Sequence, residues 1–178
     1  IASLKAIENN KNPILLVLSS DHEIKNSDEF IKAIEVGLRD SQENNLVTFG
    51  CKPTRPETGY GYIKTFEEIK NSYEKGLSFK KFIEKPDMEK AKALVRDNRY
   101  LWNSGIFLFK AKTILEELKK YQPDLLKLCE QTFNKSTLDY DFQRIESKAF
   151  KNLGWKPKKQ FDQELPKIIK YYKEKFIW

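Results

Sequence analysis

The chain has 178 residues and a formal net charge of +7, with 39% hydrophobic and 13% aromatic residues. This length and apolar content predict a folded domain and exclude a chain that is disordered throughout. No run approaches the roughly 18 apolar residues that a membrane span needs. Residues 150–178 hold eight Lys against three acidic residues, which leaves only +2 for residues 1–149. A basic face is therefore confined to the tail, and we expect neither nucleic acid nor a membrane as partner.

The chain has two cysteines, Cys51 and Cys129, and one histidine, His22. Two thiols are too few for a disulfide framework, and none of these three residues lies at the spacing of a metal site. The first residues also lack the basic and apolar regions of a secretory leader. We therefore expect free thiols in a reducing compartment and a cytoplasmic location.

The first fifty residues are typical of a strand, a crossover helix and a second strand. After a helix-like opening, residues 14–18 form an apolar run between a proline and a serine, which favours a parallel strand buried on both faces. Ser27 and Asp28 can cap the helix that follows, and residues 46–49 form the second strand. The apolar face of the helix would comprise Phe30, Ile34, Gly37 and Leu38.

The next elements are separated by clear turn signals. Pro and Gly punctuate a loop over residues 50–61, and the polar residues 64–76 predict a variable hairpin connection. Residues 77–83 alternate well enough for another strand. Asp87 can cap a helix after that strand. The apolar positions of this helix would be Ala91, Leu94 and Val95.

The alternation continues to residue 133. Residues 100–105 are predicted to form a polar and aromatic loop that leads into a fully apolar strand at residues 106–109. Two helices follow, around residues 114–121 and 125–133. Strands that alternate with helices predict an α/β sandwich with a mainly parallel sheet.

Polar residues follow the first predicted strand directly. Ligands of open α/β sheets gather at the carboxyl ends of strands, so Asp21 is a candidate for holding Mg²⁺ together with phosphate oxygens. The alternative is an Asp that caps the next turn. His22 is more typical of a packed or hydrogen-bonding residue than of a metal ligand.

Five further residues, in three segments, suggest a polar ligand. Gly59 and Gly61 would let backbone N–H groups approach a sugar or phosphate, or they form only a tight turn. Glu84 can accept hydrogen bonds from hydroxyl groups while Lys85 meets a phosphate, although adjacent opposite charges are also common on plain surfaces. Asn103 offers a donor and an acceptor to a hexose hydroxyl, or simply forms a turn.

Five segments, taken in order, carry a resemblance to a known family. They are residues 18–22 (LSSDH), 48–53 (TFGCKP), 56–63 (PETGYGYI), 82–87 (FIEKPD) and 102–107 (WNSGIF). Together they resemble the bacterial mannose-1-phosphate guanylyltransferases, and the resemblance covers residues 1–148. Five ordered motifs at the family's spacing make a far more specific match than any one of them.

This resemblance implies a Rossmann-like, three-layer nucleotide-diphospho-sugar transferase fold and the reaction of GTP with mannose 1-phosphate to give GDP-mannose and pyrophosphate. By analogy, Asp21 would ligate Mg²⁺ and Gly61 would lie against the sugar. Glu84 and Asn103 would hold mannose hydroxyls. Lys85, the candidate catalytic cation, would contact the sugar phosphate.

The resemblance also suggests that parts of the family's site are missing from the chain. The family has a Gly-rich loop bearing Arg and Lys before the first matched segment, and a second metal-binding Asp in a Trp-Ser-Asp context after the last. Neither occurs in these 178 residues. We therefore expect a truncated nucleotidyltransferase domain of uncertain turnover. The alternative is a non-catalytic sugar-phosphate-binding remnant, or a subunit that needs a partner chain.

The last thirty residues form a separate region in this interpretation. Residues 149–178 read as a basic tail with an amphipathic helix. Its apolar stripe would comprise Phe161, Leu165, Ile168, Ile169 and Tyr172. The tail resembles the C-terminus of sugar-nucleotide epimerases and dehydratases. Tyr171 and Lys175 have the spacing of a catalytic pair of that family, but no dinucleotide loop precedes them, and we attribute the spacing to chance.

Overall fold

The computed structural model describes residues 1–8, 11–70, 75–140 and 142–154. The chain divides into two compact units, residues 1–122 and 123–178, and each is treated separately below. The predicted boundary at residue 148 follows the extent of the family resemblance and stays a prediction. The predicted helix of the tail lies outside the described residues.

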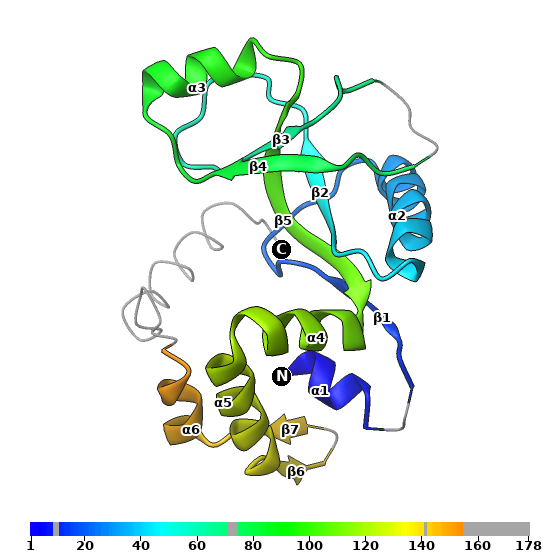
Figure 1. Ribbon diagram of the computed structural model, residues 1–178, viewed down its shortest axis with the longest axis vertical. Helices are drawn as coiled ribbons and strands as arrows, with labels where there is room; N and C mark the ends of the chain where they lie inside the picture. The colour runs from blue at the N-terminus through cyan, green and yellow to red at the C-terminus, as the bar shows by residue number, and fades with distance from the viewer. Residues whose placement is uncertain (9–10, 71–74, 141, 155–178) are drawn as a thin grey trace, which may run out of the picture. The chain divides into compact units, whose positions relative to one another are not determined.

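The first unit holds the sheet and most of the helices (Figure 1). Its elements are α1 (Ala2–Ala6), β1 (Ile14–Val17), α2 (Ser27–Gln42), β2 (Val47–Cys51), β3 (Tyr62–Thr65), β4 (Phe79–Ile83), α3 (Met88–Val95), β5 (Tyr100–Lys110) and α4 (Ala111–Tyr121). The helices lie where the sequence pattern predicts them.

Two helix starts show how local chemistry sets the boundaries. Helix α3 begins at Asp87, whose carboxylate accepts a hydrogen bond from the Lys90 N–H at 2.8 Å, as predicted. Helix α2 is capped one residue earlier than predicted. The side-chain oxygen of Asn26, rather than Ser27 or Asp28, accepts from the Glu29 N–H at 3.2 Å.

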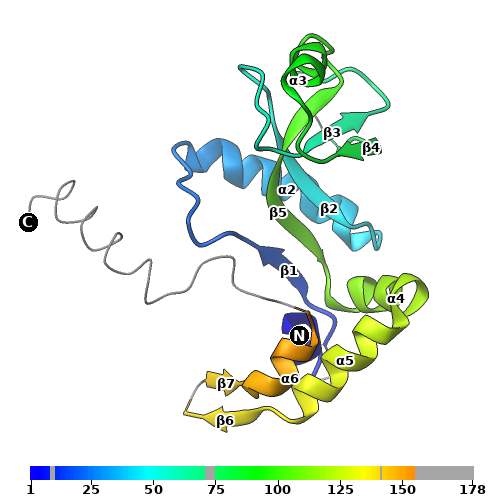
Figure 2. The same cartoon turned by 90° about the vertical axis from the view of Figure 1, so that its left-hand side faces the viewer.

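The prediction of a mainly parallel sheet is wrong, because every strand pair of the five-stranded sheet is antiparallel. The strand order is β1-β5-β3-β4, and β2 also pairs with β5. Strands β1 and β2, joined through α2, therefore run parallel to each other, as a crossover unit requires. They never pair, because β5 lies between them in the opposite direction (Figure 2).

Strand β5 starts earlier than predicted. Residues 100–105, expected as a loop, belong to the strand, which runs through Tyr100–Lys110. The loop-like composition marks a bulge instead. One residue of β2 separates the pairs Thr48–Phe107 and Gly50–Asn103, whereas three residues of β5 do. Gly105 takes up the irregular backbone with φ of 73°.

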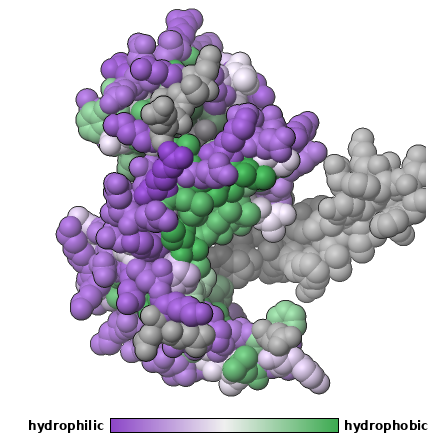
Figure 3. Space-filling view, turned by 90° about the vertical axis from the view of Figure 1, so that its right-hand side faces the viewer, coloured by the Kyte–Doolittle hydropathy of each residue, from purple (hydrophilic) through white to green (hydrophobic). Residues whose placement is uncertain are grey.

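Strand β1 is less buried than predicted. The apolar run predicts burial on both faces, but Val17 is 41% exposed and Leu18, which follows the strand, 49%. The strand lies at the end of the sheet path and pairs with β5 along one edge. Figure 3 shows an apolar area on one face of the molecule, surrounded by hydrophilic side chains.

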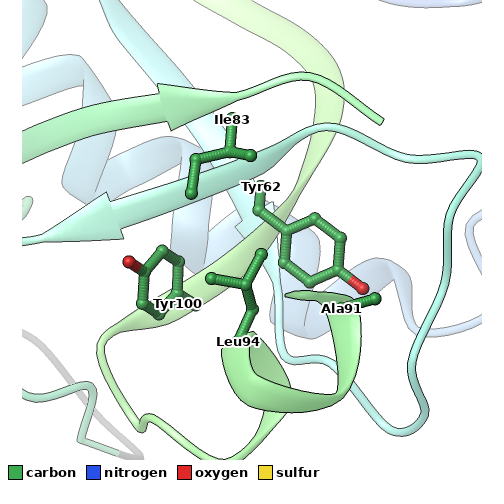
Figure 4. Packing of buried hydrophobic residues seen from close by; sticks show 5 residues of the cluster. All are labelled: Tyr62, Ile83, Ala91, Leu94 and Tyr100. Atoms are coloured by element: carbon green, nitrogen blue, oxygen red, sulfur yellow. The ribbon is translucent and has the colours of Figure 1, made fainter. Parts of the chain in front are cut away.

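The best-packed part of the first unit is a cluster between α3 and one face of β3, β4 and β5, here called the α3 core (Figure 4). Its members are Tyr62, Ile83, Ala91, Leu94 and Tyr100. Figure 4 shows Leu94 reaching up from the helix between the two tyrosine rings. This core fixes β3, β4 and β5 relative to one another and so positions whatever lies on the opposite face.

The second unit is small. Within its described residues it contains α5 (Pro123–Asn134), β6 (Thr137–Asp139), β7 (Phe142–Arg144) and α6 (Ser147–Asn152). Helices α5 and α6 pack together, and the Thr132 hydroxyl lies 3.4 Å from the Ala149 carbonyl. The strands form a two-stranded antiparallel hairpin.

Candidate functional site

Three of the predicted site residues lie side by side in one row across the sheet. Tyr62 pairs with Ile83 of β4 and with Trp102 of β5. Gly61 is consequently flanked by Glu84 and Asn103, and the Asn103 N–H donates to the Gly61 carbonyl at 2.8 Å. Directly paired residues point to the same face of a sheet, and successive residues to opposite faces. The Glu84–Gly61–Asn103 row thus lies on the face opposite the α3 core.

Gly61 has no room for a side chain at the centre of this row. A Cβ atom placed there would overlap the Phe82 ring and lie 3.2 Å from Glu84 Oε2. The Phe82 ring, which is 47% exposed, therefore packs on Gly61 and offers an apolar surface beside the Glu84 carboxylate. Gly59 differs, because a Cβ there would meet only Glu57 Oε1 at an ordinary 3.5 Å. Its N–H donates to that same carboxylate at 3.2 Å, which is the geometry of a tight turn.

Lys85 follows the row at the end of β4. Its ammonium lies 3.4 Å from Glu84 Oε1, and both side chains are more than half exposed. The backbone of Lys85 has φ of 38°, which a non-glycine residue rarely adopts. An exposed ammonium beside a carboxylate suits a ligand that carries both hydroxyl groups and an anionic group.

Neighbouring residues at the β5 bulge make hydrogen bonds to the side-chain oxygen of Asn103. Its Oδ1 lies 3.2 Å from the Thr48 hydroxyl and 3.4 Å from the Gly105 N–H. The Ser104 hydroxyl donates to the Phe49 carbonyl at 2.7 Å and so ties the bulge to β2. The bulge is therefore a fixed structure, and it determines where the Asn103 amide points.

Sequence reasoning missed the residues that support the loop ahead of β3. The Trp102 ring, on the α3 side of β5, packs edge-on against Tyr60 with 5.3 Å between centroids, and Arg55 lies 5.8 Å from its centroid. The Tyr62 hydroxyl exchanges hydrogen bonds with the backbone of Glu57, both at 2.9 Å. The density of aromatic residues around both glycines was the available signal.

Asp21 is not part of the row and follows the end of β1. The β1–β5 ladder ends at Val17–Phe107, and Asp21 follows four residues later in an exposed turn. It makes no hydrogen bond or ion pair with another residue that the structure describes. No group of three or more His, Cys, Asp or Glu side chains that could hold a metal occurs in the described ranges. Asp21 can thus offer Mg²⁺ one carboxylate, which suffices only if the ligand supplies further oxygens.

A cluster of three charged side chains at the end of α3 lies outside the row. Asp97 accepts hydrogen bonds from Nε and Nη2 of Arg99, both at 2.9 Å, and lies 3.4 Å from Lys64 Nζ. The Arg99 hydrogen bonds are the main cause that lowers the pKa of Asp97 to about 2. This cluster stabilises the end of α3 and has no role in the row.

The geometry defines a class of site. A carboxylate and an amide on one sheet face, with an aromatic ring packed on the glycine between them and an ammonium after them, match a ligand rich in hydroxyl groups that carries an anion. The fold that presents them is α/β, with helices packed against an antiparallel sheet.

Comparison with known proteins identifies the family. The sequence profile of the nucleotidyl transferase family matches residues 1–158. The chain belongs to this family.

Two relatives within this family show how much of a longer protein the chain matches. A mannose-1-phosphate guanylyltransferase of Escherichia coli is 40% identical over 151 residues, which cover 84% of this chain and 32% of the relative. The xanthan biosynthesis protein XanB of Xanthomonas campestris is 41% identical over 150 residues, 84% of this chain and 31% of its own length. The chain thus spans about a third of the length of these relatives.

Two solved structures share the fold. The mannose-6-phosphate isomerase of Helicobacter pylori superposes with a TM-score of 0.73 at 35% identity, over 85% of this chain and 57% of the other. The mannose-1-phosphate geranyltransferase of Thermus thermophilus superposes with a TM-score of 0.66 at 25% identity, over 90% and 43% of the two chains. Among the described residues, no helix is long and apolar enough to span a membrane.

Proposed function

We propose that this chain carries the sugar-phosphate-binding part of a mannose-1-phosphate guanylyltransferase, which joins GTP and mannose 1-phosphate into GDP-mannose and releases pyrophosphate. The observation that carries the proposal is the Glu84–Gly61–Asn103 row. Its residues come from three of the five motifs of the resemblance, and the relatives named above support the choice of sugar phosphate. A cytoplasmic location in GDP-mannose biosynthesis follows as an expectation.

The row would bind the hexose through complementary hydrogen bonds. The Glu84 carboxylate accepts, and the Nδ2 group of the Asn103 amide donates. A sugar hydroxyl also donates one hydrogen bond and accepts others, so vicinal hydroxyls can bridge the two side chains. The sugar would lie against Gly61 and the Phe82 ring that packs on it, beside Glu84 Oε2.

Lys85 would then meet the phosphate of the sugar. In the proposed reaction a phosphate oxygen of mannose 1-phosphate forms a bond to the α-phosphorus of GTP. The bond from that phosphorus to the bridging oxygen breaks, and pyrophosphate leaves with the electron pair. The contribution of Lys85 is positioning and neutralisation of charge, since phosphoryl chemistry of this kind depends mainly on these two effects.

Asp21 would hold a Mg²⁺ ion through its single carboxylate. When bound, the ion would neutralise the charge that develops on the phosphates of GTP. The exposed position of Asp21 after β1 leaves its carboxylate available to an ion that the nucleotide also coordinates.

One observation favours binding without turnover as the second candidate. The three residues of the row lie within the first unit and are joined by the sheet, whereas the described residues contain no group of three or more His, Cys, Asp or Glu side chains that could hold a metal. A homo-oligomer or a complex with a partner chain is compatible with both candidates.

Pyrophosphate release with GTP, mannose 1-phosphate and Mg²⁺ tests the proposal, with Asp21→Ala and Glu84→Gln beside the unchanged chain. Release that requires both side chains supports the transferase function. Absence of release, combined with binding of mannose 1-phosphate that requires Glu84, supports the binding candidate. Absence of both contradicts the assignment of the row.

A further inference from the structure

The Asn103 amide can point in two ways, and the row works differently in each. With Oδ1 toward the interior, its Nδ2 group presents two N–H donors to a ligand. With the amide turned over, the ligand would meet an acceptor beside the Glu84 carboxylate, which is also an acceptor. The neighbours of Asn103 determine which arrangement holds.

Three contacts fix the orientation. The Thr48 hydroxyl lies 3.2 Å from Asn103 Oδ1 and also 3.2 Å from the Ile106 carbonyl. It has a single proton, so it donates to one of these oxygens at a time. The Gly105 N–H can only donate and points at the same Asn103 atom from 3.4 Å. That atom must therefore be the oxygen, because a nitrogen there would set two donors against each other.

The opposite end of the amide makes no hydrogen bond to any residue that the structure describes. Asn103 Nδ2 has no acceptor among the residues that the structure describes. Its two N–H donors are therefore left for a ligand, in the same row as the acceptor oxygens of Glu84. Donors and acceptors on neighbouring strands then match the dual character of a hydroxyl group.

From these contacts we infer that Thr48 is a positioning residue, which holds the Asn103 amide with its oxygen inward so that its N–H donors face the sugar phosphate. Thr48 acts through Asn103, which lies 55 residues away in the chain. This inference rests on the proposed function. It adds that the site selects a ligand that accepts hydrogen bonds from the Nδ2 group of Asn103.

Substitutions at Thr48 separate the hydroxyl from the rest of the side chain. Thr48→Val keeps the branched shape and removes the hydroxyl, whereas Thr48→Ser keeps the hydroxyl. We expect Thr48→Val to weaken the binding of mannose 1-phosphate about three- to tenfold, the loss of roughly one hydrogen bond. Thr48→Ser should stay within about twofold of the unchanged chain. Calorimetric titration measures both, and thermal melting confirms that each variant is folded.

A double-mutant cycle shows whether Thr48 acts through Asn103. In an Asn103→Ala background, Thr48→Val should have no further effect on binding. NMR supplies a second readout without ligand. The side-chain NH₂ signals of Asn103, identified by their absence in Asn103→Ala, should shift in Thr48→Val and stay in place in Thr48→Ser.

The outcomes separate this inference from the proposed function. If the unchanged chain binds mannose 1-phosphate and Thr48→Val binds it equally well, the positioning role is wrong and the proposed function stands. An equal loss from Thr48→Val with and without Asn103 also overturns the positioning role. If the unchanged chain does not bind mannose 1-phosphate, the proposed function fails and the inference fails with it.

Discussion

The α3 face of β3, β4 and β5 and the β1 end of the sheet differ in how well they cover their apolar side chains. On the α3 face, Tyr62 of β3 and Leu94 of α3 are 0% and 6% exposed. At the β1 end, Val17 and Leu18 keep more than 40% of their surface exposed. The Glu84–Gly61–Asn103 row lies on the other face of β3, β4 and β5, where Phe82 is 47% exposed. Rigid packing behind a binding row holds its geometry, and the β1 end contributes only Asp21 to the proposed site.

The largest expected effect comes from opening the α3 core. Leu94→Ala should lower the free energy of unfolding by about 2–5 kcal/mol, since it removes buried methyl groups and leaves a cavity. The matched change Leu18→Ala, at a side chain that is 49% exposed, should cost less than about 1 kcal/mol. Urea unfolding of both variants measures the difference. An equal loss of unfolding free energy in Leu94→Ala and Leu18→Ala would contradict the contrast between the α3 face and the β1 end.

The two glycines of the motif provide the next comparison. Gly61→Ala should cost about 1–3 kcal/mol, because the new methyl group displaces Phe82 and crowds Glu84. It should also abolish the binding of mannose 1-phosphate. Gly59→Ala meets only an ordinary contact, and we expect a change within about 1 kcal/mol and unchanged binding. Unfolding and calorimetric titration test the pair. A Gly59→Ala variant as damaged as Gly61→Ala would mean that the turn, and not the row, carries the site.

The pH dependence of the unfolding free energy tests the Asp97–Arg99 pair at the end of α3. The folded pKa of Asp97 is about 2, below its usual 3.8, so the ionised carboxylate is stabilised in the folded state. Its contribution is fully present above pH 4 and is lost as the pH falls toward 2. The unfolding free energies of the unchanged chain and Asp97→Asn should therefore converge over that interval. Arg99→Lys, which keeps the charge without the forked hydrogen bonds, should give an intermediate curve. Parallel curves for all three chains would contradict this role of the pair.

The smallest effect on stability is expected at β1. Val17→Lys should leave the free energy of unfolding within about 1 kcal/mol, because the side chain is already 41% exposed. A charge on a strand at the end of a sheet should also reduce self-association at high concentration, which light scattering measures. A loss as large as that of Leu94→Ala would show that this end is covered after all.

The sequence predicts the helices well and the sheet direction badly, for a physical reason. Helix starts depend on local chemistry, such as the Asp87 cap, which a sequence displays directly. Strand direction depends on the partner. The apolar run at residues 14–18 fits a buried parallel strand, and nothing in it shows that β5 runs the other way beside it.

In the site, too, the sequence displays the local features but not those that depend on a distant partner. Motifs pointed to Glu84, Gly61 and Asn103, but only the register of β3, β4 and β5 places them in one row on one face. The polar composition of residues 100–105 suggested a loop, whereas it belongs to a bulged strand. Thr48 was missed as a site residue because its contact with Asn103 joins positions 55 residues apart.

The central claim is that the Glu84–Gly61–Asn103 row binds a sugar phosphate. The most direct measurement is a titration of the ¹⁵N-labelled chain with mannose 1-phosphate, followed by amide NMR, with mannose and inorganic phosphate as separate controls. The account predicts saturable shifts at Gly61, Glu84 and Asn103, strongest for the sugar phosphate and absent in Glu84→Gln. Shifts confined to residues outside the row, or identical shifts with inorganic phosphate alone, would contradict it.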